Sequence, residues 1–173
     1  RPKSFPRIRL FSTLVPKSAV QVTVDVGGEK IPVSQPLGQS LDVATLTNHH
    51  GESVRGSVAV PLVKLAWARS GDKGNHANIG VIARKADYLP FLRAALTEGA
   101  VAEHMQHVLD PDHGSVSRWE LPGFLAMNFL LKNALGGGGI ASLRIDPQGK
   151  AFAQQLLDFP VPVSAEIAKE VNG

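Results

Sequence analysis

The order of the predicted strands and helices after Pro61 constrains the fold of this chain more than any other feature of its sequence. Apolar segments bounded by glycine, proline and polar residues predict strands at 62–69, 77–84, 116–121 and 140–145. Spaced apolar residues with capping residues predict helices from Leu89 after Asp87, over 101–109 beyond Gly99, over 122–135 and over 150–157. This order, β-β-α-β-α-β-α, predicts an α+β fold in which helices cover one mainly antiparallel sheet as a two-layer sandwich.

The first 60 residues differ from the rest, because their apolar segments are short and extended. Residues 20–26 alternate apolar and polar side chains up to Gly27 and Gly28, and together with 29–33 they predict a β-hairpin. Residues 34–56 are rich in Ser, Thr, Asn, His and Gly, which is typical of a long loop or linker. We therefore expect a β-rich lead-in or linker segment over 1–60, an α+β domain over 61–163 and a C-terminal tail over 164–173.

The net charge of +3 comes from the N-terminal segment alone. Residues 1–17 contain no acidic residue and five basic ones, namely Arg1, Lys3, Arg7, Arg9 and Lys17. A solvated tail or linker explains this basic arm better than a phosphate-binding arm does. Only Phe5 and Phe11 accompany the charges, so the arm is no platform for stacking bases, and we predict no nucleic-acid partner.

The absence of cysteine excludes disulfides, thiolate metal sites and cysteine nucleophiles. It fits a reducing compartment, so we predict a cytoplasmic location. The longest apolar stretch, 121–131, is interrupted by Pro122, Gly123 and Asn128 and is shorter than the roughly 18 residues that a membrane helix needs. We therefore predict no membrane partner. Because the chain lacks an initiator Met and an apolar signal segment, we expect a processed chain or a fragment of a longer protein.

The densest group of reactive side chains lies between residues 69 and 78. It consists of Arg69, Ser70, Gly71, Asp72, Lys73, Gly74, Asn75, His76 and Asn78. Glycines allow backbone N–H groups to converge on an anion, and Arg69 or Lys73 would neutralise that anion. Asp72 with Lys73 or His76 could move a proton, and Ser70 has His76 six residues further on. The segment has neither the Walker A spacing nor G-x-G-x-x-G.

From these residues we predict a site with two groups of side chains. The candidate catalytic residues are Asp72, Lys73, Ser70 and His76, and the candidate ligand-binding residues are Arg69, Gly71, Gly74, Asn75 and Asn78. The alternative is a polar β-turn in which Asp72 pairs internally with Lys73 or Arg69. Residue types alone do not decide between a site and a turn.

Other polar or aromatic features favour a structural interpretation. The cluster His104, His107, Asp110, Asp112 and His113 has ligand residues but not the H-E-x-x-H spacing, and histidines near a helix C-terminus are stabilised by the dipole, so we predict no metal. Gly136 to Gly139 would either approach a ligand or end a helix. Asn128 would either face a ligand or make a core hydrogen bond to backbone, and the hydrogen bond is the favoured interpretation. Trp67 and Trp119 are expected to anchor the core or an interface.

The sequence around the polar segment resembles the small C-terminal domain of the acyclic terpene utilisation AtuA family. The resemblance rests on LAWARSGDKGNHANIGV at 65–81, on Asn128 and Phe129, on the glycine run at 136–139, and on LLDFPVP at 156–162. It extends over about residues 61–163. Residues 6–10 and 14–16 resemble, more weakly, the segment that precedes this domain in longer members.

The resemblance implies a ferredoxin-like α+β fold and a role in catabolism of acyclic terpenoid or branched-chain acids, beside enzymes of acyl-CoA metabolism. It implies no assigned reaction and no cofactor. These 173 residues do not include the large N-terminal domain of the longer members, so we expect a site shared between the two domains to be incomplete in the sequence given.

Two hypotheses about function follow. In the first, the 69–78 segment binds an anionic ligand, a carboxylate or an acyl-CoA, as part of a larger enzyme. In the second, the chain is a non-catalytic assembly domain that completes the site of a larger AtuA-type domain or subunit, or forms a homo-oligomer. The basic arm and the extended segment 159–165 favour the second hypothesis, because both can lie across a neighbour.

Overall fold

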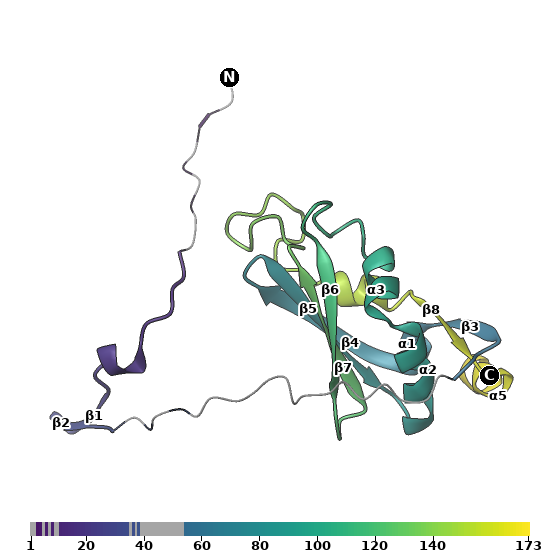
Figure 1. Cartoon of the computed structure of the whole chain (residues 1–173), viewed down its shortest axis with the longest axis horizontal. Coiled ribbons are helices and arrows are strands. Elements are labelled where there is room, and N and C mark those ends of the chain that lie inside the picture. The colour runs from purple at the N-terminus through teal and green to yellow at the C-terminus, as the bar shows by residue number, and fades with distance from the viewer. Residues whose placement is uncertain are drawn as a thin grey trace. The chain divides into compact units, whose positions relative to one another are not determined.

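The computed structural model describes residues 3, 4, 6, 8, 11–34, 36, 38 and 54–173 (Figure 1). Arg1, Arg7 and Arg9 of the basic arm, and most of the loop predicted at 34–56, lie outside the described residues. The chain divides into two compact units, a small one over Leu10–Thr47 and a larger one that contains Asn48–Gly173.

The small unit contains the predicted hairpin. After a 3-10 helix, η1 (Lys17–Ala19), strands β1 (Thr23–Val26) and β2 (Glu29–Pro32) pair antiparallel around Gly27 and Gly28. Both glycines have positive φ, 62° and 93°, as a two-residue hairpin turn requires. The Asp25 carboxylate accepts a hydrogen bond from the Gly28 N–H at 2.9 Å. The prediction of a hairpin here is confirmed.

The larger unit contains a four-stranded sheet, a two-stranded sheet and several helices. Its strands are β3 (Val58–Pro61), β4 (Ala66–Lys73), β5 (His76–Ala83), β6 (Ser115–Leu121), β7 (Ala126–Lys132) and β8 (Pro160–Val163). Its helices are α1 (Leu62–Leu65), η3 (Ala86–Tyr88), α2 (Leu89–Ala95), α3 (Glu98–His104), α4 (Phe152–Leu156) and α5 (Ala165–Asn172). None of the described helices is long and apolar enough to cross a membrane.

The topology of the four-stranded sheet confirms the α+β fold. The strand order is β4-β5-β7-β6, and every neighbouring pair is antiparallel. Strands β5 and β6 both run antiparallel to β7, which lies between them, so they are parallel to each other and are connected through α2 and α3. This is the split β-α-β arrangement of ferredoxin-like folds. Strand β8 pairs with β3 in a separate sheet.

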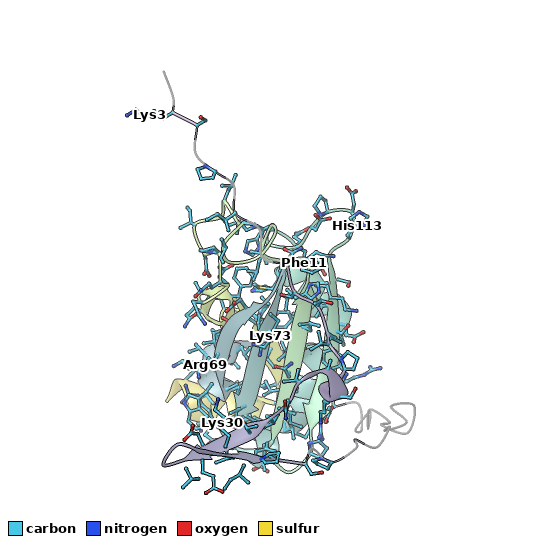
Figure 2. The ribbon with its side chains drawn as sticks, turned by 90° about the vertical axis from the view of Figure 1, so that its left-hand side faces the viewer. Lys3, Phe11, Lys30, Arg69, Lys73 and His113 are labelled. Atoms are coloured by element: carbon cyan, nitrogen blue, oxygen red, sulfur yellow. The ribbon has the colours of Figure 1, made fainter. Side chains whose placement is uncertain are left out.

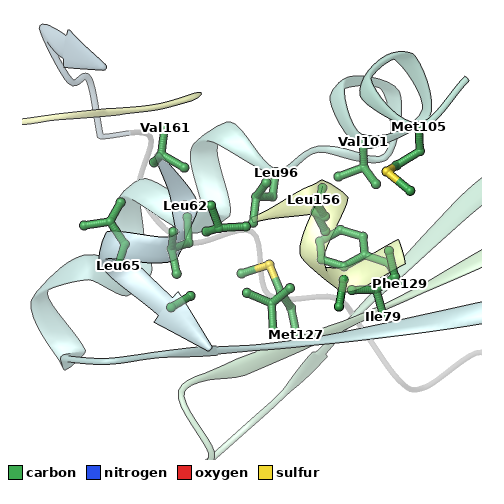
Figure 3. Packing of buried hydrophobic residues seen from close by; sticks show 14 of the residues in the cluster. Leu62, Leu65, Ile79, Leu96, Val101, Met105, Met127, Phe129, Leu156 and Val161 are labelled. Carbon is green, nitrogen blue, oxygen red and sulfur yellow. The ribbon is translucent and has the colours of Figure 1, made fainter. Parts of the chain in front are cut away.

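The core lies between one face of the four-stranded sheet and the helices (Figure 3). Alternate sheet residues face it, so Ile79 of β5 and Phe129 of β7 are fully buried. Leu96, Val101 and Leu156, from the helical layer, pack against the sheet residues. The other sheet face has no helix over it in this unit (Figure 1).

The helix predicted over 122–135 is wrong. Pro122 and Gly123 belong to the turn between β6 and β7, where Gly123 has φ +84° and the Phe124 N–H bonds the Leu121 carbonyl at 3.1 Å. The apolar residues that follow form β7, which pairs on both sides. A short, continuously apolar segment fits a buried strand as well as a helix, and pairing with β5 and β6 decides between them.

The strand predicted over 140–145 is also wrong. These residues form turns between β7 and α4, and Ile140, Leu143 and Ile145 are exposed. The segment is anchored by Arg144, whose guanidinium donates to the carbonyls of Val108 and Ala134 at 2.6 and 2.7 Å. Arg144, which lies between Leu143 and Ile145 in the sequence, thus holds this segment by side-chain hydrogen bonds, whereas a strand would be held by pairing with a neighbouring strand.

Three smaller predictions, namely the strand over 62–69, the cap at Asp87 and the helix break at Gly99, also need correction. Residues 62–69 divide into α1 and the start of β4. Asp87 lies in η3 and makes no capping bond to α2; the cap in this region is Thr97, whose hydroxyl accepts from the Ala100 N–H at 3.1 Å at the start of α3. The break between α2 and α3 therefore lies before Thr97, and Gly99 is inside α3. Apart from these corrections, residues 165–172 of the expected C-terminal tail form helix α5.

Candidate functional site

The polar segment 69–78 is a strand hairpin rather than a loop. Strand β4 continues to Lys73, and only Gly74 and Asn75 form the turn before β5. Because side chains alternate along a strand, the reactive groups are divided between the two sheet faces. Ser70 and Asp72 share the parity of the buried Ala66, whereas Arg69, Gly71 and Lys73 share that of the exposed Trp67.

The Ser70 hydroxyl connects β4 to α4. It donates to the Lys150 carbonyl at 3.2 Å and accepts from the Ala153 N–H at 2.9 Å. The residue is 7% exposed, the only polar residue among the buried ones described. Both functions of the hydroxyl are thus used in holding the start of α4, and a catalytic role for Ser70 stays a prediction that this geometry does not favour.

Asn75 and His76 hold the segment that follows β7. Asn75 accepts from the Gly137 N–H at 2.6 Å and donates to Asn133 Oδ1 at 3.1 Å. His76 Nδ1 accepts from the Asn133 N–H at 2.9 Å. Through these contacts Asn75 and His76 hold the residues after β7 in place. Their roles in ligand binding and proton transfer stay predictions.

The glycine run at 136–139 packs on the turn of the hairpin. Gly138 has φ +88°, and a Cβ there would lie 2.8 Å from the carbonyl oxygen of Gly74. No other residue fits such a close backbone contact without displacement. The glycines therefore serve backbone packing against the hairpin turn, and the expectation that they end a helix is wrong, because strand β7 precedes them.

A hollow of about 430 Å³ lies along the β4 edge of the sheet. It is lined by Arg69, Ser70, Gly71, Asp72, Lys73, Asn78, Gly80 and Lys150. Six of the nine predicted site residues are among those lining residues, and Asp72 is the single carboxylate among them. The other three, Gly74, Asn75 and His76, are not among the lining residues. Figure 2 shows Arg69 and Lys73 on the same side of the sheet.

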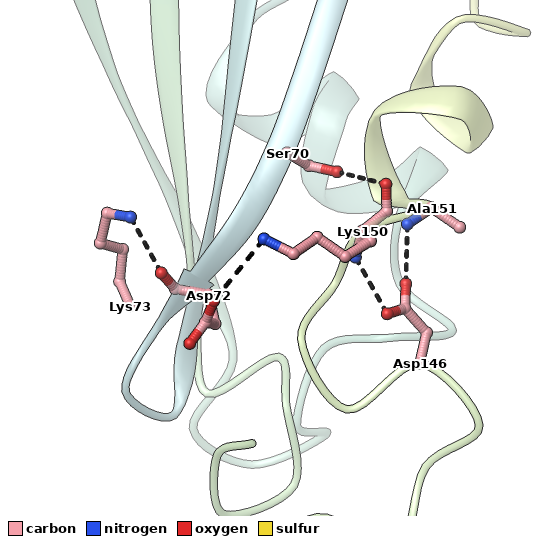
Figure 4. A network of polar contacts seen from close by, with 6 residues as sticks. All are labelled: Ser70, Asp72, Lys73, Asp146, Lys150 and Ala151. Carbon is pink, nitrogen blue, oxygen red and sulfur yellow. Dashed lines mark hydrogen bonds and ion pairs between the residues drawn. The ribbon is translucent and has the colours of Figure 1, made fainter.

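Three cations meet one carboxylate in this hollow. Lys150 Nζ lies 3.9 Å from Asp72 Oδ1, and Lys73 Nζ donates to the Asp72 carbonyl at 2.9 Å (Figure 4). Within the described part of the chain, the Arg69 guanidinium makes no hydrogen bond or ion pair. The hollow thus has an excess of positive charge, with Asp72 neutralising one of the three cations.

Lys150 was not predicted as a site residue, because it lies 77 positions beyond Lys73 in the sequence. The Asp146 carboxylate positions it by accepting from the backbone N–H groups of Lys150 and Ala151 at 2.9 and 2.8 Å (Figure 4). The sequence feature that could have drawn attention to Lys150 is the turn signature at 146–149, which directly precedes it. A Cβ at Gly71 would lie 3.2 Å from Lys150 Nζ, so glycine leaves room for the amine over the strand.

Asn78 and Asn128 form a pair of amides on β5 and β7. Asn78 Nδ2 donates to Asn128 Oδ1 at 3.2 Å, and both residues are half-buried. Gly80 leaves the space beside them open, since a Cβ there would be 4.0 Å from Asn128 Oδ1. Asn128 is therefore a neighbour of the hollow, and the expected core hydrogen bond inside a helix is wrong.

The cluster of histidines and aspartates at 104–113 has structural contacts. His104 and His107 both bond Gln155, through its backbone carbonyl at 3.0 Å and its side-chain oxygen at 2.5 Å. Asp110 accepts from the backbone N–H groups of Asp112 and His113. In the part of the chain that the structure describes, no group of three or more His, Asp or Glu is placed to hold a metal ion.

Replacing Asp110 with Asn will lower stability at neutral pH, and this difference will shrink in acid. The pKa of Asp110 lies below its ordinary value, chiefly because the carboxylate accepts the His113 and then the Asp112 backbone N–H. A lowered folded-state pKa contributes stability above the unfolded value, about pH 4, which is lost as the pH falls through the folded-state pKa. Urea unfolding at stepwise lower pH checks this, with the exposed Asp112→Asn as control. A difference independent of pH would contradict it.

A second hollow of about 450 Å³ lies in the small unit, lined by residues between Lys17 and Gly38. Among its described lining residues Lys17 is the only charged one, so these residues do not bring several reactive groups together. Its walls are exposed residues of the hairpin segment. It therefore offers less chemistry than the hollow at β4.

These observations define the class of protein: a small α+β domain with helices on one face of an antiparallel sheet and a cationic hollow at one sheet edge. Residues 60–162 match the family model of the AtuA ferredoxin-like domain. The chain belongs to this family, which confirms the resemblance seen in the sequence. No curated protein and no solved structure was found to match the chain.

Proposed function

We propose that this domain binds an anionic ligand, a carboxylate or an acyl-CoA, in the hollow at the β4 edge. The observation that carries the proposal is the presence of three cations, Arg69, Lys73 and Lys150, around a space with one carboxylate. Small-molecule sites commonly occupy about 300 to 1,000 Å³, and this hollow lies in that range.

The three cations suit different parts of an anion. Arg69 offers a planar fork that matches two oxygens of a carboxylate or phosphate, whereas each lysine acts as a point charge. The Asn78 amide can add a neutral hydrogen bond from the neighbouring strand. Asp72 holds Lys150 near the hollow, and an entering anion would compete with it for the amine.

The larger role proposed is catabolism of acyclic terpenoid or branched-chain acids, in which this domain forms part of a larger cytoplasmic enzyme. Membership in the AtuA ferredoxin-like family supports this context. Proton transfer by Asp72 or Lys73 belongs to the same proposal, because both line the hollow. Ser70 and His76 are weaker candidates, since their polar atoms hold other segments of the domain.

Replacing Lys150 or Arg69 with Met will weaken anion binding about 10- to 100-fold each, because each substitution removes a charge-assisted hydrogen bond of about 1.5 to 3 kcal/mol. Isothermal titration with a branched-chain carboxylate, coenzyme A, an acyl-CoA and inorganic phosphate measures this and separates carboxylate from phosphate recognition. Lys64→Met, on helix α1 outside the hollow, is the matched control. Equal affinities for the parent and for an Arg69→Met/Lys150→Met double variant would overturn the proposal.

A second candidate function is assembly with another domain or subunit, or with a second copy of the chain. The observation that favours it is the sheet face without helices, on which two tryptophans are exposed. Monomeric proteins seldom leave such aromatic surface in contact with water unless it serves binding.

A further inference from the structure

The uncovered face of the four-stranded sheet presents ordered rows of side chains, here called the open face. The register of the strands sets three rows: Trp67, Ile82, Ala126, Leu121; then Arg69, Gly80, Asn128, Trp119; then Gly71, Asn78, Leu130, Ser117. In a fourth row, Lys73 pairs with His76 and Ser115 pairs with Lys132. The rows change from apolar at one end to cationic at the other.

The apolar end has the composition of a binding interface. Trp67 is 54%, Ile82 48%, Trp119 45% and Leu121 43% exposed, and these residues belong to adjacent rows. Tryptophan and arginine are the residues most enriched among those that dominate binding energy at protein interfaces. The aromatic residues therefore mark this end of the face as a contact surface.

The neighbouring turn extends this apolar end and is strained. Phe124 is 74% exposed, and Leu125 has φ +50°, a left-handed conformation that costs a leucine roughly 1 to 2 kcal/mol. Strained residues tend to persist at ligand-binding and contact sites, where the strain serves function. An exposed, strained aliphatic turn beside the tryptophans is thus a second, independent indication of a contact surface.

The charges of the open face have a single sign. None of the strand residues on this face is Asp or Glu, whereas Arg69, Lys73 and Lys132 all lie on it. Arg84, just after β5, stacks its guanidinium over the Trp67 ring with 4.6 Å to the ring centroid. A partner that buries this face must therefore supply carboxylates.

A second copy of the chain does not meet that requirement. In a two-fold dimer the same patch contacts itself, so the cations of one copy would find no acid on the other. Single-stranded nucleic acid does not fit well either, because the tryptophans lie on the edge strands β4 and β6, with Gly80 and Asn128 between them, and Arg84 already covers the Trp67 ring.

We propose that the open face docks a different folded protein surface, one that presents carboxylates to Arg69, Lys73 and Lys132 and aliphatic or aromatic side chains to Trp67, Trp119 and Leu121. The inference rests on the assembly role proposed above and gives it a surface and a partner chemistry. The open face shares Arg69, Gly71, Lys73, Asn78 and Gly80 with the hollow, whereas Trp67, Trp119, Leu121 and Lys132 lie outside the hollow and allow docking to be tested apart from anion binding. A partner docked there would cover that side of the hollow.

Selection of a random 12-residue peptide library displayed on phage, against the full chain, tests this chemistry. The expected consensus combines Asp or Glu with Leu, Phe or Trp. Synthetic consensus peptide will bind a Trp119→Ser/Leu121→Ser variant at least tenfold more weakly than the parent. The Leu143→Ser variant, which replaces a leucine that is 94% exposed and lies in no strand of the open face, will bind the peptide with the affinity of the parent. If the double variant does not fold, Lys132→Glu serves instead, because it reverses a charge on the open face outside the hollow.

Four results would overturn the inference. Two concern the selection, which would enrich no peptide, or a consensus without acidic residues. The other two are that the consensus peptide binds the open-face variants as tightly as the parent, or that it binds the chain at another surface. A dimer in light scattering that these variants dissociate would favour a second copy instead. Binding of a fluorescent uridine 12-mer that depends on Trp119 would favour nucleic acid. Anion titration of the Trp119→Ser variant keeps the proposals apart, since anion affinity should stay at the parent value even where peptide binding is lost.

Discussion

Replacing Phe129 with Ala will lower the free energy of unfolding by about 3 to 5 kcal/mol, the largest single effect that we expect in this domain. Phe129 is fully buried at the centre of β7, the strand that pairs with both β5 and β6. Truncation loses the transfer free energy of the ring and leaves a cavity that the two-sided pairing prevents from closing. Urea unfolding followed by circular dichroism measures the change.

The matched control is Leu130→Ala, at the next position on the opposite sheet face. Leu130 is only half-buried, so its truncation will cost less than half as much. The same scan tests the strand itself: large losses at Met127, Phe129 and Leu131 with smaller ones between them follow a period of two. A Leu130→Ala loss as large as that of Phe129→Ala would contradict the strand and restore the helical interpretation.

Replacing Arg93 with Ala will cost about 2 to 3 kcal/mol, because it isolates the Glu120 carboxylate. Arg93 NH2 lies 2.6 Å from Glu120 Oε2, and its Nε donates to the same oxygen at 2.7 Å. The Glu120 side chain is 9% exposed, and its Oε1 is buried without a hydrogen-bond partner. Because the Arg93 side chain is 32% exposed, we expect less than the loss of about 3 to 5 kcal/mol found for fully buried pairs.

A double-mutant cycle distinguishes the cost of a buried, unpaired Glu120 carboxylate from the cost of lost packing. Adding Glu120→Leu to Arg93→Ala removes the carboxylate and will recover most of the lost stability, whereas packing loss would leave the double variant as unstable as the single one. Arg55→Ala, at an exposed arginine, is the control for general effects of removing an arginine. Failure of Glu120→Leu to rescue would show that the ion pair is not the source of the effect.

The parts of the fold that were predicted correctly depend on local signals. The hairpin at β1 and β2 was predicted from alternation around Gly27 and Gly28, and β5 and β6 from their short apolar segments. Turn chemistry and side-chain alternation act between residues close in sequence, so they can be read without the fold. Strand β7 was predicted wrongly, as a helix over 122–135, because its apolar residues fit a helix and a strand alike. Pairing with β5 and β6, which are distant in the sequence, decides between the two.

The candidate site follows the same division. Arg69, Asp72, Lys73 and Asn78 were predicted as a group because they are close in sequence, whereas Lys150 joins them only through the fold. The division of the group between two sheet faces was also not predictable, since it depends on β4 continuing to Lys73. That extension depends on eight residue pairs with β5, a tertiary feature of the sheet.

By itself the sequence determined the family, the α+β class and the chemical character of the 69–78 segment, because these depend on residue types and on short-range spacing. The tertiary structure alone decided that Ser70, Asn75 and His76 hold neighbouring segments, that Lys150 completes a cationic hollow, and that the tryptophans lie on an uncovered face. The physical reason is that hydrogen bonds, charge clusters and burial are set by which strands and helices meet, and those contacts join residues far apart in the chain.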